Sequence, residues 1–288
     1  MTQACQTPTA TEAACLRQRA RQLLQWQDPT AKAEAVLQLH ASQAQMELDV
    51  QQALAAPEPD EPGMPPGLRL APHTEVARRS PATLQGRAVL VHAIVHIEYN
   101  AIHLALDAVW RFAGMPASYY GDWLKIAAEE ARHFQLLRAQ LQAMGCDYGD
   151  FPAHQGLWAM CSKTRHDILA RMALVPRTLE ARGLDATPLI QHKLRQVDTE
   201  DAHAICAVLD IILREEVGHV AIGNYWYRWL CHQRGLDAVA LYPQLVAQYE
   251  APRPKPPLNL DARRAAGFTE QELEYLQWGS ENPPGGAG

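Results

Sequence analysis

EEARH at residues 129–133 and EEVGH at residues 215–219 are the two stretches that decide the expected fold. Each contains a Glu-x-x-His motif within a helical hydrophobic pattern, and each is preceded by one more helical glutamate, Glu98 or Glu180. The order Glu, Glu-x-x-His, Glu, Glu-x-x-His is the ligand arrangement of a carboxylate-bridged two-metal centre in a four-helix bundle. The sequence therefore predicts a metal site together with the fold that carries it.

The spacing within each motif brings its two side chains to one face of a helix. An α-helix advances by about 100° and about 1.5 Å per residue, so residues at i and i+3 are neighbours. This predicts that Glu130 with His133, and Glu216 with His219, each reach one metal. Glu129 and Glu215 lie at i−4 from these histidines and share the same faces, so spacing alone does not choose between them. We select Glu130 and Glu216 because i, i+3 is the usual spacing at such centres.

The positions of the turns predict that all the ligands lie at one level of the bundle. The turn at Met115 lies 17 residues after Glu98 and 15 residues before Glu130. The turn at Asp198 lies 18 residues from both Glu180 and Glu216. Two antiparallel hairpins folded at these turns would each bring their glutamates to matching heights.

Hydrophobic periodicity predicts an all-α fold, a ferritin-like four-helix bundle with one long crossover. The four helices are expected at residues 82–113, 118–144, 157–182 (interrupted at Gly183 and Pro188, then continuing over 189–197) and 199–233, with the crossover at residues 146–155. The bundle then spans residues 81–235. It follows a helical N-terminal extension (1–56) and a proline-rich linker (57–80). It precedes a C-terminal extension (236–288) with a proline-rich linker at 251–257, a short helix at 268–278 and a disordered tail at 281–288.

Composition limits the compartment and the partners. The net charge is −6 and the basic residues form no long cluster, which disfavours nucleic acid as the default partner without excluding a local basic patch. We see no secretory signal and no uncharged apolar stretch long enough to span a bilayer. The six cysteines form no C-x-x-C pair and are interpreted as free thiols. We therefore expect a cytoplasmic protein that does not bind a membrane.

The metal is expected to be iron. Four converging carboxylates repel one another strongly, and two divalent cations would balance their four negative charges. Oxygen and imidazole donors suit two iron ions, with manganese or a mixed iron–manganese pair as the alternative, better than a structural zinc. The i, i+4 pair His92 and His96 could also chelate a metal, but packing is the better interpretation for both.

The sequence around the predicted ligands resembles a bacterial and fungal ferritin-like family of uncharacterised function. That family is distantly similar to the non-haem di-iron tRNA hydroxylases. The resemblance covers residues 81–235 and is carried by HIE (96–98), LALDA (104–108), DWL (122–124), EEARHF (129–134), ARMALVP (170–176), EARGLD (180–185) and EEVGHVAIG (215–223). It implies a ferritin-like bundle with a two-metal centre, and it supplies no substrate.

These observations lead to one leading hypothesis and two alternatives. The leading one is a di-iron oxidase or oxygenase that uses O2 on a small molecule inside the bundle, with an entrance at the break between Gly183 and Pro188. The electron donor is unknown, and a homodimer is left open. The alternatives are an iron-handling protein such as a ferroxidase, and a non-catalytic interaction module that a metal stabilises.

Overall fold

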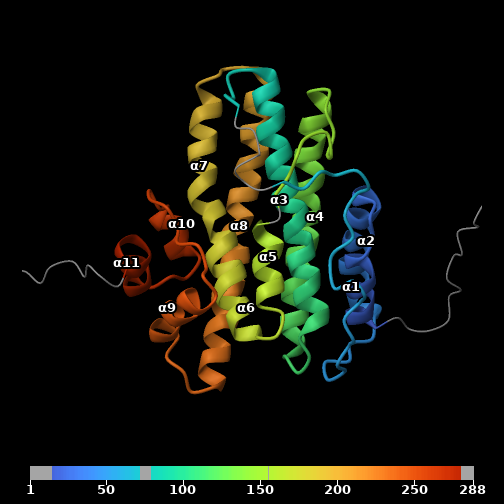
Figure 1. The fold of residues 1–288 in the computed structure, drawn as a ribbon, viewed down its shortest axis with the longest axis vertical. Coiled ribbons are helices and arrows are strands. Elements are labelled where there is room, and N and C mark those ends of the chain that lie inside the picture. Colours follow the sequence, from blue (N-terminus) through green and yellow to red (C-terminus); the bar gives the residue numbers. More distant parts are fainter. Residues whose placement is uncertain (1–14, 72–78, 155, 280–288) are drawn as a thin grey trace, which may run out of the picture.

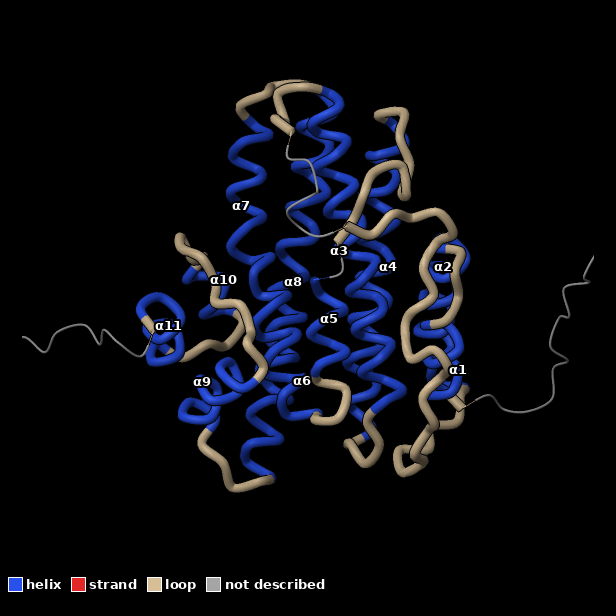
Figure 2. The backbone as a smooth tube through the Cα atoms, in the orientation of Figure 1, coloured by secondary structure: helices blue, strands red, loops and turns tan. Residues whose placement is uncertain are grey.

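The computed structural model describes residues 15–71, 79–154 and 156–279, and these residues are almost entirely helical (Figures 1 and 2). Within them the β-structure is limited to an isolated bridge between Leu70 and Ala153. The elements in chain order are α1 (Leu16–Leu24), α2 (Pro29–Ser42), the 3-10 turn η1 (Gln43–Gln45), α3 (Leu84–Arg111), α4 (Ala117–Ala143), α5 (Gly156–Lys163), α6 (Ile168–Leu174), the π-helical segment η2 (Val175–Glu180), α7 (Ala181–Arg195), α8 (Glu200–Gln233), α9 (Ala238–Gln248), α10 (Leu260–Ala265) and α11 (Glu270–Trp278). The predicted all-α class is confirmed.

The long helices pack side by side as two hairpins. Helix α3 packs along α4, and α7 packs along α8, while α4 and α8 also contact each other. In Figure 1 these helices run along the long axis of the molecule. The first hairpin turns at Gly114, whose φ of +78° favours glycine, and α4 ends before Gly145 with the same φ. The arrangement is compatible with the predicted ferritin-like bundle, with the connection after Gly145 as its crossover.

The third helix differs from its prediction. Helix α7 runs without a break through Gly183 and Pro188, so the predicted interruption there is wrong. Proline cannot donate to the carbonyl four residues before it, and here the Leu184 carbonyl accepts a hydrogen bond from the Asn259 side chain at 3.2 Å instead. The irregular part lies earlier, at residues 164–167 and in η2, which ends at Glu180.

The flanking segments are packed against the bundle. The N-terminal helices end at Gln45, whereas the predicted helical extension ran to residue 56. The proline-rich segment that follows is held in place, since Gly63 donates its N–H to the Leu24 carbonyl at 2.9 Å. At the other end α9 and α10 were not predicted, and α11 occupies the position of the predicted short helix. The predicted tail at 281–288 lies outside the described residues, as do 72–78 of the predicted linker.

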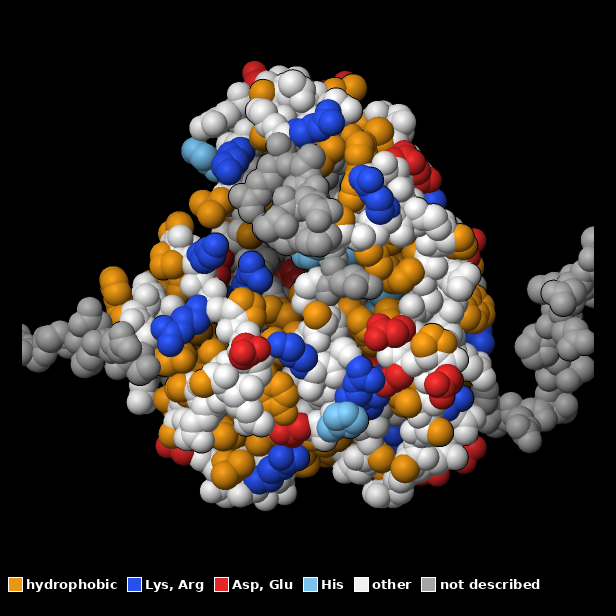
Figure 3. All heavy atoms as spheres, in the orientation of Figure 1, with side chains coloured by type: hydrophobic (Ala, Val, Ile, Leu, Met, Phe, Trp, Pro, Cys, Tyr) orange, Lys and Arg blue, Asp and Glu red, His pale blue; other side chains and the backbone are white. Residues whose placement is uncertain are grey.

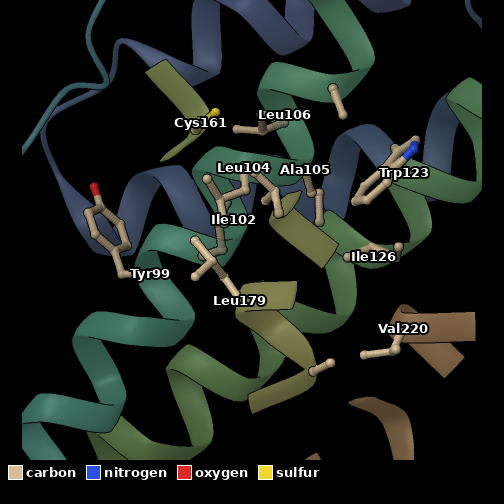
Figure 4. Close-up of a cluster of buried hydrophobic side chains, with 14 of the residues drawn as sticks. Tyr99, Ile102, Leu104, Ala105, Leu106, Trp123, Ile126, Cys161, Leu179 and Val220 are labelled. Atoms are coloured by element: carbon tan, nitrogen blue, oxygen red, sulfur yellow. The ribbon is translucent and has the colours of Figure 1, made fainter. Parts of the chain in front are cut away.

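In the described part of the chain, apolar side chains fill the core between the helices. On the face seen in Figure 3, acidic, basic and apolar side chains are interspersed. Figure 4 shows a cluster of buried side chains that α3, α4, η2 and α8 share, including Ile102, Trp123 and Leu179. The five described cysteines are free thiols, as predicted, and Cys5 lies outside the described residues.

Helix α3 is long and apolar enough to cross a membrane by length and composition. Its most apolar 18-residue window has a mean hydropathy of 1.4, yet 78% of that window is buried inside the fold. This burial is typical of the core helix of a soluble protein.

A buried ion-pair network joins α3 to the neighbouring segments. Asp107 is fully buried, and its two carboxylate oxygens lie 2.5 Å from Arg171 and 2.7 Å from Arg111. Burial alone would raise the pKa of Asp107, but the two guanidinium groups outweigh burial and hold the pKa below its usual value. Arg111 also binds Asp60 at 2.7 Å, which ties the proline-rich segment to the bundle.

Replacing Asp107 with Asn should destabilise the fold strongly, because it leaves the buried Arg171 without a counter-charge and Arg111 with Asp60 alone. We expect the free energy of unfolding to fall by roughly 3–5 kcal/mol, measured by urea denaturation at pH 7. The loss should shrink as the pH falls below about 4, since a depressed pKa gives stability only above the range in which the unfolded carboxyl titrates. Asp261→Asn, which alters a 98% exposed carboxylate, is the control and should cost less than about 1 kcal/mol. Equal effects in the two variants would contradict this account.

Candidate metal centre

Four of the predicted ligands form one compact buried group. Glu98 comes from α3, Glu130 and His133 come from α4, and Glu216 comes from α8. One ligand atom from each lies within 4.8 Å of the others, and all four residues are buried. This group could hold a metal ion.

The remaining two predicted residues lie beside this group. His219 on α8 places its Nδ1 2.9 Å from a Glu130 oxygen and 3.4 Å from a Glu216 oxygen. Glu180, the last residue of η2, is partly exposed, but its Oε2 is buried. Burial, and then the charges of Glu216 and Glu130, raise the pKa of Glu180 well above its usual value. The structure therefore brings all six predicted residues to one place.

Glu130 lies at the centre of this arrangement. Its Oε1 is 2.9 Å from the Nδ1 of His219, and its Oε2 is 3.4 Å from the Nδ1 of His133. On the two sides, Glu98 lies 3.3 Å from the Nδ1 of His133 and Glu216 lies 3.4 Å from the Nδ1 of His219. The two halves of the cluster are thus near copies of each other, with one carboxylate between them.

The first glutamate of each EE pair, Glu129 or Glu215, contacts the histidine of the opposite helix, whereas the second faces the cluster. The Nε2 of His133 lies 2.8 Å from Glu215, and the Nε2 of His219 lies 2.9 Å from Glu129. Each histidine is therefore bound by a carboxylate from the opposite helix. The spacing left Glu129 and Glu130 equivalent, and the packing of α4 against α8 gives them different roles. In the sequence, the one sign of a role for Glu129 and Glu215 was their position four residues before His133 and His219.

The unpartnered atoms in the cluster fit a bound cation. Glu130 Oε1, Glu180 Oε2 and His219 Nδ1 are buried without a hydrogen-bond partner. A buried polar atom without a partner costs free energy, and a metal ion would supply that partner. Because each Nε2 faces a carboxylate, its proton would stay there when a metal binds, which would leave each Nδ1 lone pair for the metal.

The electrostatics of the cluster favour added positive charge. Burial, followed by the charge of Glu130, raises the pKa of Glu98 to about 7. Burial alone would lower the pKa of His133, but hydrogen bonds and charges from Glu130 and Glu98 outweigh it and raise that pKa to about 11. Without a metal the cluster therefore retains protons, and a divalent cation would displace them.

The histidines on the other face of α3 are packed side chains, as the sequence indicated. His92 accepts a hydrogen bond from the Gly149 N–H at 3.0 Å, and His96 lies 2.8 Å from the Tyr148 hydroxyl. Burial lowers the pKa of both imidazoles to about 4, so both are neutral near pH 7. Together with the contact of His96 Nε2 to the His154 carbonyl at 2.9 Å, these contacts account for both nitrogens of His96 and for the Nε2 of His92, while the Nδ1 of His92 is buried without a hydrogen-bond partner.

A cavity of about 540 Å³ opens onto the cluster and is lined by Glu98, Glu130, Glu180 and Glu216. Pockets of this size accommodate drug-sized molecules. Gly183 and Thr187 also line it, so the predicted entrance region faces the cavity although the chain there is helical. The centre is therefore accessible to a small molecule.

A close contact with α8 supports η2, the segment that carries Glu180. A Cβ atom added to Gly223 would lie 2.5 Å from the Cβ of Pro176, so only glycine allows this approach. A π-helical turn inside a helix frequently marks a functional site. The packing thus links the position of Glu180 to one glycine on the opposite helix.

Replacing Gly223 with Ala should displace η2 and destabilise the fold by about 1–3 kcal/mol through overpacking. Gly218→Ala on the same helix is the matched control, since its added Cβ would meet nothing within 4 Å. Helix propensity alone would make that control neutral or more stable by roughly 0.5–1 kcal/mol. Thermal unfolding of both variants measures the difference, and equal stabilisation of the two would show that the contact does not constrain η2.

Comparison with known proteins supports the family assignment and supplies no activity. A curated protein of Haemophilus influenzae, described as an uncharacterized protein, is 50% identical over 209 residues, which cover 70% of this chain and 72% of that protein. No solved structure matches the chain. The family model described as "Protein of unknown function (DUF455)" matches residues 25–274, which include all six clustered residues. The chain therefore belongs to the DUF455 family.

Proposed function

We propose that this chain is a non-haem two-metal carboxylate protein that uses O2 to oxidise a small organic molecule, as an oxidase or an oxygenase. One observation carries the proposal: the buried cluster of four glutamates and two histidine Nδ1 atoms opens onto a cavity of about 540 Å³. A purely structural metal site has no need of such an opening.

In this proposal each half of the cluster holds one metal. Glu98 and His133 would bind the first metal, Glu180, Glu216 and His219 would bind the second, and Glu130 would bridge them. Carboxylate oxygens and imidazole nitrogens favour iron, with manganese or a mixed pair as the alternative. Four carboxylates balance the charge of two divalent cations, which relieves the repulsion that raises the pKa values of Glu98 and Glu180.

The protein residues would orient the ligands and exclude water. Glu215 and Glu129 accept the Nε2 protons of His133 and His219, which fixes each ring with its Nδ1 towards the cluster. When bound, the metals would supply the redox chemistry with O2. Apolar side chains such as Ile97, Met160 and Ile212 line the cavity and would hold a substrate away from water.

The cavity favours an organic substrate over iron alone. A ferroxidase needs a path for ions, and a cavity with mostly apolar walls is a poor one because ions lose hydration there. We therefore place oxidation of a small molecule ahead of iron handling. The cytoplasm remains the expected compartment, and the electron donor remains unassigned.

The proposal predicts about two irons or manganese ions per chain in full-length protein from supplemented cells. Glu130→Ala and Glu216→Ala should lose that metal, and with it any O2 consumption by the reduced protein. Glu200→Ala is the matched control, because Glu200 and His203 have the same spacing but Glu200 is exposed at the start of α8. Metal analysis and an oxygen electrode give the readouts. Stoichiometric zinc, or a folded protein without metal, would instead support a structural or interaction role.

The crossed histidine contacts predict a second effect on metal affinity. Glu129→Gln and Glu215→Gln should each weaken metal binding by about 10–100-fold, because the histidine loses the carboxylate that orients it. Arg132→Gln is the control, since Arg132 contacts Glu215 from a half-exposed position without touching a histidine. Competition with a chelator measures the affinities. Unchanged affinity in both glutamate variants would show that these contacts do not tune the centre.

A further inference from the structure

The outer end of the cavity is lined by basic side chains. Arg182 on α7 and Lys255 in the C-terminal segment are exposed, and Lys163 at the end of α5 is about half-exposed. The glutamates at the inner end are mostly buried, so the cavity runs from the cluster to the surface. Figure 3 shows basic side chains beside a recess in which acidic atoms are visible.

These basic groups are largely free of internal partners. Neither Arg182 nor Lys255 forms an ion pair with any residue in the described ranges. Lys163 donates to the Tyr249 carbonyl at 3.4 Å and lies 3.7 Å from Glu250, but Glu250 is 85% exposed, and such a pair contributes little. The outer end of the cavity therefore has positive charge available for a ligand.

The acid that lines the cavity outside the cluster is already neutralised. Asp185 lies 2.6 Å from Arg263 and accepts the backbone N–H of Asn259 at 2.8 Å. It points its charge towards the C-terminal segment and does not offset the basic rim. A cationic ligand would thus meet repulsion at the rim, and an anionic one would meet attraction.

Between the rim and the cluster the walls are mostly apolar or small. Side chains of this kind come from α3, α5, η2 and α8: Ile97, Ala101, Leu157, Met160, Leu179 and Ile212. Such walls favour burial of an apolar body and disfavour a polar one. The cavity thus has an acidic metal-binding end, an apolar middle and a basic mouth.

We propose that the cavity binds a small molecule with an apolar body and one anionic head group, a carboxylate or a phosphate. The head lies at Arg182, Lys255 and Lys163, and the body extends towards the cluster. That this molecule is the substrate rests on the proposed function, whereas its binding requires only the cavity and its basic rim. Carboxylate and phosphate share the same recognition by arginine and lysine.

Calorimetric titration of the full-length protein with four eight-carbon probes tests the head group. Octanoate, octyl phosphate, 1-octanol and octylamine share the apolar chain and differ in charge. We expect at least one anion to bind at least tenfold more tightly than 1-octanol, with octylamine weakest, and the tighter anion identifies the head group. Octylamine binding as tightly as both anions, or no binding by any anion, would overturn the proposal.

Variants at the surface test the rim without disturbing the core. The double variant Arg182→Gln, Lys255→Gln should weaken anion binding at least fivefold and leave 1-octanol unchanged. Lys193→Gln is the matched control, because Lys193 is exposed on the same helix but does not line the cavity. Gly183→Leu should weaken all the probes, since its side chain would enter free space in the cavity wall. Wild-type anion affinity in the double variant would contradict the assignment.

The same titration separates this inference from the proposed function. Anion binding should persist after metal removal, because the head lies at the rim. Binding lost with the metal but retained in the double variant would place the head at the cluster and refute the inference. Anion binding in a protein that takes up no iron or manganese would support the inference and refute the proposed function. Metal and O2 consumption without anion binding would do the reverse.

Discussion

Convergence of four carboxylates in an apolar interior is the constraint on which the rest of the structure depends. Glu98, Glu130, Glu180 and Glu216 reach one site from four segments, and burial with mutual repulsion raises the pKa values of Glu98 and Glu180. Burying four carboxylates without a counter-charge costs free energy, and bound cations would offset that cost. This convergence explains why both histidines direct Nδ1 inwards, and why Glu130 Oε1, Glu180 Oε2 and His219 Nδ1 are buried without a hydrogen bond.

The second layer of the site depends on how α4 packs against α8. Each helix supplies a histidine to the cluster and a glutamate to the histidine of the other helix. The EE pair in each motif is thus divided between two roles, one facing the cluster and one orienting a ring. A shift of either helix would disturb both histidines together, which couples the geometry of the site to the packing of the bundle.

The C-terminal segment supports the irregular third helix. Arg177 in η2 lies 2.7 Å from the buried carboxylate of Glu272 in α11, and Arg263 donates to the Ala181 carbonyl at 3.2 Å. Asn259 satisfies the carbonyl that Pro188 leaves free. These contacts surround Glu180 on both sides along the chain, and they place Lys255 at the mouth of the cavity. The C-terminal segment contributes no residue to the cluster, yet it supports Glu180 at the inner end of the cavity and supplies Lys255 at its mouth.

The sequence alone determined the helical class and the long helices α3, α4 and α8, and it pointed to the six residues that the fold brings together, because periodicity and turn positions are local properties of the chain. It did not distinguish Glu129 from Glu130, since both share a face with His133 and only the neighbouring helix separates them. It misplaced the break in the third helix, because Asn259, 71 residues after Pro188, supplies the missing hydrogen bond. The cavity and its basic mouth were decided by tertiary structure, since their residues come from distant segments that meet only when the chain folds.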